Sequence, residues 1–97
     1  MKKGYWIVAY RNISDPAALQ AYAPLAKEAL DAYGGKVLVF SPEPDVREAG
    51  VKSLLVMVEF ESLEKARQAY ASEAYAKSLR VLGNAAERDL RIVEARD

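Results

Sequence analysis

The sequence contains neither cysteine nor histidine. Without cysteine there are no disulfides, thiolate nucleophiles or sulfur metal ligands, and the chain suits a reducing cytoplasm. Without histidine there is no imidazole acid–base step, serine–histidine relay or imidazole-ligated haem, and without both residues a structural zinc site is excluded. A catalytic base acting near neutral pH would therefore be a carboxylate or a tyrosine with a shifted pKa. We expect no cofactor and no metal.

An excess of charge and a long apolar run are missing as well. Fourteen lysines and arginines balance 14 aspartates and glutamates, so the charge favours neither nucleic acid nor a membrane surface as a partner. No stretch approaches the roughly 20 apolar residues that span a bilayer. The apolar run after Lys3 stops at Arg11 without a small-residue cleavage site, so we interpret it as a strand. We expect one cytoplasmic domain over residues 1–97.

The rest of the chain is organised around residues 51–75, where an apolar run rich in β-branched residues leads into a helical pattern. Alternation puts Leu54, Val56, Val58 and Phe60 on one side of a strand and Leu55 and Met57 on the other. Both faces of this strand are apolar, and a chain of this length can supply helices for only one of them. We therefore predict a homodimer in which a second copy covers the other face.

The remaining elements follow from periodicity and capping residues. Strands are predicted at residues 4–12, 36–40 and 90–95, and residues 41–50 form an exposed loop. Ser14 or Asp15 caps a first helix that has Pro16 at its first position, with Pro24 as a kink or break, while Ser62 and Ser72 cap two later helices. The order β-α-β-β-α-α-β predicts an α+β, ferredoxin-like antiparallel sheet of strand order 4-1-3-2 with helices on one face.

Six short motifs then occur in order along the chain: GYWIV at residues 4–8, Asp15-Pro16 followed by Tyr22, Gly34-Gly35, Glu59-Phe60, the YxSxxY pattern of Tyr70, Ser72 and Tyr75, and Val93-Glu94. In these motifs the sequence resembles the domain-of-unknown-function 1330 family of the dimeric α/β-barrel superfamily. The resemblance implies a ferredoxin-like protomer that forms a dimeric α/β barrel, and it implies no established reaction. The superfamily includes cofactor-free monooxygenases, haem-dependent enzymes, isomerases and stress-induced proteins. Where the family usually carries an arginine, this chain has Leu82, with Arg80 nearby.

Aromatic and polar residues on or near the first strand are candidates for a small-molecule site. Trp6 and Tyr10 form an aromatic wall that ends at Arg11 and Asn12, which is typical of ligand pockets. The alternative is that the aromatic residues fill the core or a dimer interface and that the polar residues are solvated. Tyr22 belongs to a family motif, but it also fits the apolar stripe of its helix, with its hydroxyl at the rim.

Glu59 and Arg91 are candidates from two other strands. Glu59 shares its strand face with Leu55 and Met57, and apolar neighbours raise the pKa of a carboxylate toward that of a general base. Arg91 could pair with Glu59 or lie exposed at an edge. The predicted ligand-binding candidates are thus Trp6, Tyr10, Asn12, Tyr22, Glu59 and Arg91.

Three functions fit these observations. The first is a homodimeric binding protein, or stress-related module, that holds a small, partly aromatic metabolite between helices and sheet. The second is an enzyme of the cofactor-independent oxygenase or isomerase type, and the third is an interaction domain that acts through its dimer surface without a ligand. The missing histidine and cysteine favour the first. A cavity of roughly 300 Å³ or more with convergent polar side chains would support a ligand, whereas a filled interior would support the third.

Overall fold

The computed structural model describes residues 2–96. Its elements follow the predicted order β-α-β-β-α-α-β. They are β1 (Gly4–Ile13), α1 (Pro16–Ala32), β2 (Lys36–Ser41), β3 (Leu55–Phe60), α2 (Leu63–Ala71), α3 (Glu73–Leu82) and β4 (Ala86–Glu94). The predicted α+β, ferredoxin-like fold is confirmed.

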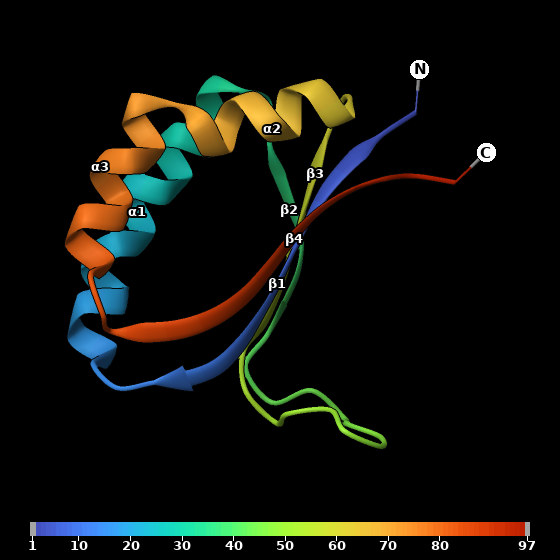
Figure 1. Ribbon diagram of the computed structural model, residues 1–97. Coiled ribbons are helices and arrows are strands. Elements are labelled where there is room, and N and C mark those ends of the chain that lie inside the picture. The colour runs from blue at the N-terminus through green and yellow to red at the C-terminus, as the bar shows by residue number, and fades with distance from the viewer. Residues whose placement is uncertain (1, 97) are drawn as a thin grey trace.

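The four strands form one antiparallel sheet in the order β2-β3-β1-β4, which is the predicted order counted from the other edge. Figure 1 shows the three helices on one side of this curved sheet. Within the described residues, the opposite side of the sheet has no helix over it. The ordinary right-handed crossovers of two β-α-β halves produce this one-sided cover.

The alternation along β1 and β3 decides what the helices bury. Trp6, Val8 and Tyr10 of β1 face the helices and are buried, as are Val58 and Phe60 of β3. Small helix residues such as Ala66 and Ala69, both fully buried, let α2 approach the sheet closely. The core therefore lies between the helices and one face of the sheet, as the sequence predicts.

The helix ends follow their predicted caps. The Asp15 carboxylate accepts a hydrogen bond from the Ala18 N–H, and the Ser62 and Ser72 hydroxyls accept from Lys65 and Tyr75. Of the two alternatives predicted at Pro24, a kink or a break, the break is wrong, because α1 continues through Pro24 to Ala32. Pro24 lies on the exposed side of the helix, where water can satisfy the backbone carbonyl that proline leaves without a partner.

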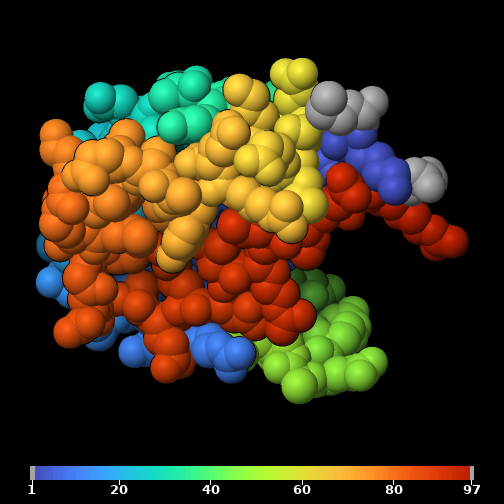
Figure 2. All heavy atoms as spheres, turned by 45° about the horizontal axis from the view of Figure 1, so that its top comes forward, coloured from blue at the N-terminus to red at the C-terminus, as the bar shows by residue number. Residues whose placement is uncertain are grey.

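Two strand boundaries differ from the prediction. The strand β3 begins at Leu55, so residues 42–54 form a longer loop that projects from the sheet away from the helices (Figure 2). The strand β4 begins at Ala86 and not at Leu90, because its first half pairs with the far end of β1, where Ile13 lies opposite Ala86. Polar residues occupy this first half of β4 and hide it from an apolar periodicity search.

The uncovered face of the sheet is largely apolar. Tyr5, Ile7, Leu55, Met57 and Val93 lie on it and are only half-buried. A charged cluster lies beside them, in which Asp89 accepts hydrogen bonds from Arg91 at 3.0 and 3.2 Å and from Arg11 at 3.4 Å. Within residues 2–96, none of the helices combines the length and apolar character that a membrane crossing requires.

Candidate functional site

A cavity of about 550 Å³ lies between α1 and the helix-facing side of the sheet. Most of its wall is apolar, and its volume is in the range of small-molecule sites. Strands β1, β2, β3 and β4 and helices α1 and α3 all contribute side chains. The wall includes Trp6, Val8, Tyr10, Leu19, Tyr22, Ala23, Ala26, Leu30, Phe40, Leu54, Val56, Val58, Tyr75 and Arg88.

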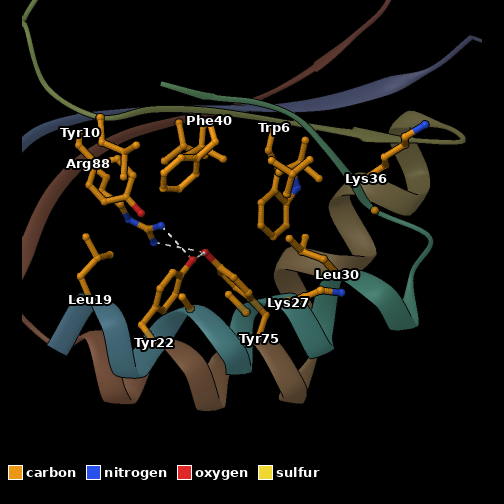
Figure 3. Close-up of a pocket in the computed structure, with 18 of the residues that line it drawn as sticks. Trp6, Tyr10, Leu19, Tyr22, Lys27, Leu30, Lys36, Phe40, Tyr75 and Arg88 are labelled. Atoms are coloured by element: carbon orange, nitrogen blue, oxygen red, sulfur yellow. Dashed lines mark hydrogen bonds between the residues drawn. The ribbon is translucent and has the colours of Figure 1, made fainter. Parts of the chain in front are cut away.

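Three polar side chains converge at one end of the cavity (Figure 3). The hydroxyls of Tyr22 on α1 and Tyr75 on α3 are 2.6 Å apart, so one donates a hydrogen bond to the other. Arg88 on β4 donates to both hydroxyls, at 3.1 Å to Tyr22 and 3.3 Å to Tyr75. Helix and sheet are thereby connected across the cavity by one hydrogen-bonded group, which we call the Arg88 cluster.

The guanidinium of Arg88 also lies near two aromatic rings. Its central carbon is 5.6 Å from the ring centroid of Tyr10 and 5.3 Å from that of Tyr22. Such cation–π contacts stabilise part of the charge. No acidic side chain within residues 2–96 forms an ion pair with Arg88. A half-buried positive charge therefore faces an apolar cavity without an anionic partner.

Burial sets the protonation of the cluster. It raises the pKa of Tyr10 and that of Tyr22 above the ordinary value of 10.0, and the nearby Arg88 opposes both shifts without cancelling them. Burial acts to lower the pKa of Arg88, but interactions with Tyr22 and Tyr75 outweigh it and the pKa is raised. At neutral pH the hydroxyls of Tyr10 and Tyr22 are therefore protonated and Arg88 is a cation.

Trp6 forms a rigid part of the wall. Its indole N–H donates to the Ala66 carbonyl at 2.8 Å, and its ring centroid is 4.8 Å from that of Tyr75 in an edge-to-face arrangement. Lys27 and Lys36 lie toward the Trp6 end of the cavity, away from Arg88 (Figure 3). Phe40 also lines the cavity although 66% of it is exposed, so the cavity is open to solvent beside β2.

The structure brings half of the predicted candidates together. Trp6, Tyr10 and Tyr22 all line the cavity. Tyr22 is buried rather than at the rim, because its hydroxyl points inward to Tyr75 and Arg88. The aromatic wall predicted along the first strand is thus one wall of a real cavity.

The other three candidates, Asn12, Glu59 and Arg91, lie outside this cavity. Asn12 is exposed and follows the irregular pairing between β1 and β4. Glu59 lies opposite Tyr5 and Arg91 lies opposite Ile7 in the sheet. Tyr5 and Ile7 are on the uncovered face, so Glu59 and Arg91 are on that face too. Arg91 pairs with Asp89 and not with Glu59, and hydrogen bonds from Arg91 hold the pKa of Asp89 below its ordinary value. The Glu59 carboxylate accepts a long, 3.5 Å hydrogen bond from the Tyr5 hydroxyl.

Sequence reasoning missed two members of the cluster. Tyr75 belongs to the YxSxxY motif, but the spacing of that motif gives no sign of its hydroxyl partner. Arg88 lies in a polar stretch that shows no apolar alternation, so only the full length of β4 places it opposite Tyr10. Arg80, which is near the place where the family usually carries an arginine, is exposed and pairs with Glu73 at 3.0 Å.

The sequence model of the family described as "Domain of unknown function (DUF1330)" matches residues 3–96. The chain belongs to the DUF1330 family. The resemblance in the six motifs is thereby confirmed over nearly the whole chain. A search of curated proteins finds no match to this DUF1330 chain.

Solved structures share the fold of this DUF1330 protein. A protein of unknown function from Rhodopseudomonas palustris, RPA0582, is 13% identical, with a TM-score of 0.76 over 99% of this chain and 84% of that one. SnoaB, a cofactor-independent oxygenase from Streptomyces nogalater, is 12% identical, with a TM-score of 0.64 over 100% and 96% of the two chains. A dimeric protein of unknown function and ferredoxin-like fold from Bacteroides fragilis is 15% identical, with a TM-score of 0.54 over 96% of each chain. At these identities the likeness concerns the fold alone.

Proposed function

We propose that this DUF1330 protein is a homodimeric binding protein for a small, partly aromatic molecule that occupies the cavity between α1 and the sheet. The observation that carries the proposal is an apolar cavity of about 550 Å³ with one polar cluster at its end. A site of this kind binds an apolar body by burial and orients it by a few polar contacts. Trp6, Tyr10 and Tyr22 are its proposed aromatic contacts.

Binding has more support than acid–base catalysis. Among the described residues that line the cavity, Asp31 carries the one carboxylate, and it is exposed and paired with Lys27 at 2.8 Å. The raised pKa values of Tyr10 and Tyr22 keep both hydroxyls protonated, so neither is a base at neutral pH. The alternative is an oxygenase reaction without a cofactor, because the fold is shared with SnoaB, a cofactor-independent oxygenase. That reaction would require a substrate that ionises without an enzyme base.

The dimer is proposed from the uncovered face of the sheet. Ile7 at its centre lies opposite Met57 on one side and Arg91 on the other, so apolar side chains share one surface with the ion pairs that Asp89 forms with Arg11 and Arg91. Two copies related by a two-fold axis would bury the apolar part and bring charges of both signs together. The dimeric ferredoxin-like protein from Bacteroides fragilis shows that the shared fold is compatible with self-association. Two sheets packed in this way form a dimeric α/β barrel.

The test of the proposed function is ligand binding to a variant with a filled cavity. Trp6 is the single tryptophan of the chain and lies in the cavity wall, so its fluorescence reports occupancy. We expect neutral and charged phenyl compounds to include binders that change Trp6 emission. Ala23→Phe, which adds a ring at a residue of α1 that lines the cavity, should abolish this response.

The matched control is Ala21→Phe, which adds the same ring to the same helix at an exposed residue outside the cavity wall. It should bind as the unmodified protein does. Equal binding by both variants would show that the compounds bind elsewhere. A compound panel that leaves Trp6 emission unchanged in the unmodified protein would contradict the proposed function.

A further inference from the structure

We infer that the molecule bound in this cavity is a monoanion, with a carboxylate or similar planar oxyanion held by Arg88 and an apolar body lying along the wall toward Trp6. This inference rests on the proposed function and adds the charge class and orientation of the ligand. It comes from the Arg88 cluster, whose donors outnumber its acceptors.

The first argument is the unneutralised charge. Arg88 is half-buried and carries a positive charge, and no carboxylate within the described residues pairs with it. A buried charge is stable when paired or hydrogen-bonded, and cation–π contacts with Tyr10 and Tyr22 supply only part of that stabilisation. An anion entering the cavity would complete the pairing.

The second argument is a count of hydrogen-bond donors. A guanidinium has five N–H donors, and those of Arg88 make two hydrogen bonds, one to Tyr22 and one to Tyr75, and also interact with the Tyr10 hydroxyl, so not all of the five are used. The contact between Tyr22 and Tyr75 uses one of the two phenolic protons, and no acceptor for the other is found within residues 2–96. Spare N–H donors and one spare O–H donor therefore meet at the same end of the cavity. A planar oxyanion accepts from both kinds of donor at once.

The third argument concerns how many charges the ligand carries. Lys27 is paired with Asp31 at 2.8 Å, and it lies with Lys36 at the opposite end of the cavity from Arg88 (Figure 3). The apolar side chains of Phe40 and Trp6 lie between the two ends (Figure 3). A ligand with one anionic group at Arg88 and an apolar remainder matches this distribution, whereas a second anionic group beside these apolar side chains would be desolvated without a partner.

The test compares two ligands of the same shape, 3-phenylpropanoate and 3-phenylpropanamide, by isothermal titration calorimetry on the full chain at fixed ionic strength and pH 7. The carboxylate should bind about 10- to 100-fold more tightly than the amide, the factor that a charge-assisted hydrogen bond gives. Arg88→Met should remove this preference while amide binding continues, which shows that the cavity of the variant is intact. Arg88→Lys should retain part of the preference, because it keeps the charge without the fork of donors.

The matched control is Arg80→Met, which removes an exposed arginine outside the cavity and the same amount of charge. It should leave the preference unchanged. Equal binding of the two compounds to the unmodified protein would overturn the anion inference and leave the proposed function standing. Binding of neither compound, together with a silent compound panel, would remove the proposed function and this inference with it. An equal loss of preference in Arg80→Met and Arg88→Met would assign the effect to net charge and overturn the role of Arg88.

Discussion

Tyr22→Phe isolates the energetics of the Arg88 cluster. The substitution removes one buried hydroxyl, which takes part in a 2.6 Å hydrogen bond with Tyr75 and a 3.1 Å hydrogen bond with Arg88. Arg88 and Tyr75 keep the hydrogen bond between them, which Arg88 donates at 3.3 Å. With a net value of about 0.5–1.5 kcal/mol for each of the two hydrogen bonds, the free energy of unfolding at pH 7 should fall by about 1–3 kcal/mol.

The same variant should behave differently at alkaline pH. Burial raises the pKa of Tyr22 in the folded protein above its ordinary value of 10.0, so the unfolded chain releases this proton first as pH rises. The stability that this shift contributes is fully present below pH 10 and decreases above it. For one such tyrosine the loss is about 1.4 kcal/mol between pH 9 and pH 11. Phenylalanine has no proton to lose, so the stability difference between Tyr22→Phe and the unmodified protein should shrink by this amount between pH 9 and pH 11.

Urea unfolding at pH 7, 9 and 11, at one protein concentration, measures this change. Fixing the concentration matters because the stability of a self-associating protein depends on it. Tyr33→Phe, in a half-buried tyrosine at the end of α1 outside the cavity wall, serves as the control. If Tyr22→Phe is destabilised by the same amount at pH 7 and pH 11, burial does not hold the Tyr22 proton and the account of the cluster is wrong.

Two further substitutions test the packing of the sheet on its two sides. Gly4→Ala should lower the free energy of unfolding by about 3 kcal/mol or more in a urea titration, because its Cβ would lie 2.5 Å from the backbone oxygen of Ser62. Gly34 has open space around the position of a Cβ but a φ of +72°, so Gly34→Ala should lower the free energy of unfolding by only about 1 kcal/mol. Equal losses in Gly4→Ala and Gly34→Ala would refute the close approach of β1 and α2. Met57→Glu places a carboxylate on the uncovered sheet face and should halve the mass in sedimentation velocity, since an unpaired buried charge costs about 3–5 kcal/mol. Val81→Glu, on an exposed apolar residue of α3, should not change the mass, and a Met57→Glu protein of unchanged mass would refute the proposed dimer face.

The fold could be predicted from the sequence because each strand and helix carries a local signal. Alternation along residues 4–10 identifies β1 and its buried face, and Asp15, Ser62 and Ser72 mark the helix starts. The crossover rule then leaves few arrangements of four strands. The boundaries of β3 and β4 were less accurate, since they depend on pairing partners that lie far away in the chain.

The site was predictable only in part, for a related reason. Trp6 and Tyr10 belong to the strong pattern of β1, which shows that they face the helices. Arg88 has no such pattern, and its position opposite Tyr10 depends on strand pairing across an irregular register. Glu59 and Arg91 were selected for their charge, but alternation directs both to the uncovered face of the sheet. Charge identifies chemistry in a sequence, whereas tertiary pairing decides which charges meet.

The most direct measurement is a crystal structure of the protein grown with 3-phenylpropanoate. The account predicts a carboxylate within hydrogen-bond distance of the Arg88 guanidinium and of a Tyr22 or Tyr75 hydroxyl, with the phenyl ring in the cavity toward Trp6. A ligand bound only on the uncovered sheet face, or seated in the cavity with its carboxylate turned away from Arg88 toward Lys27 and Lys36, would contradict it.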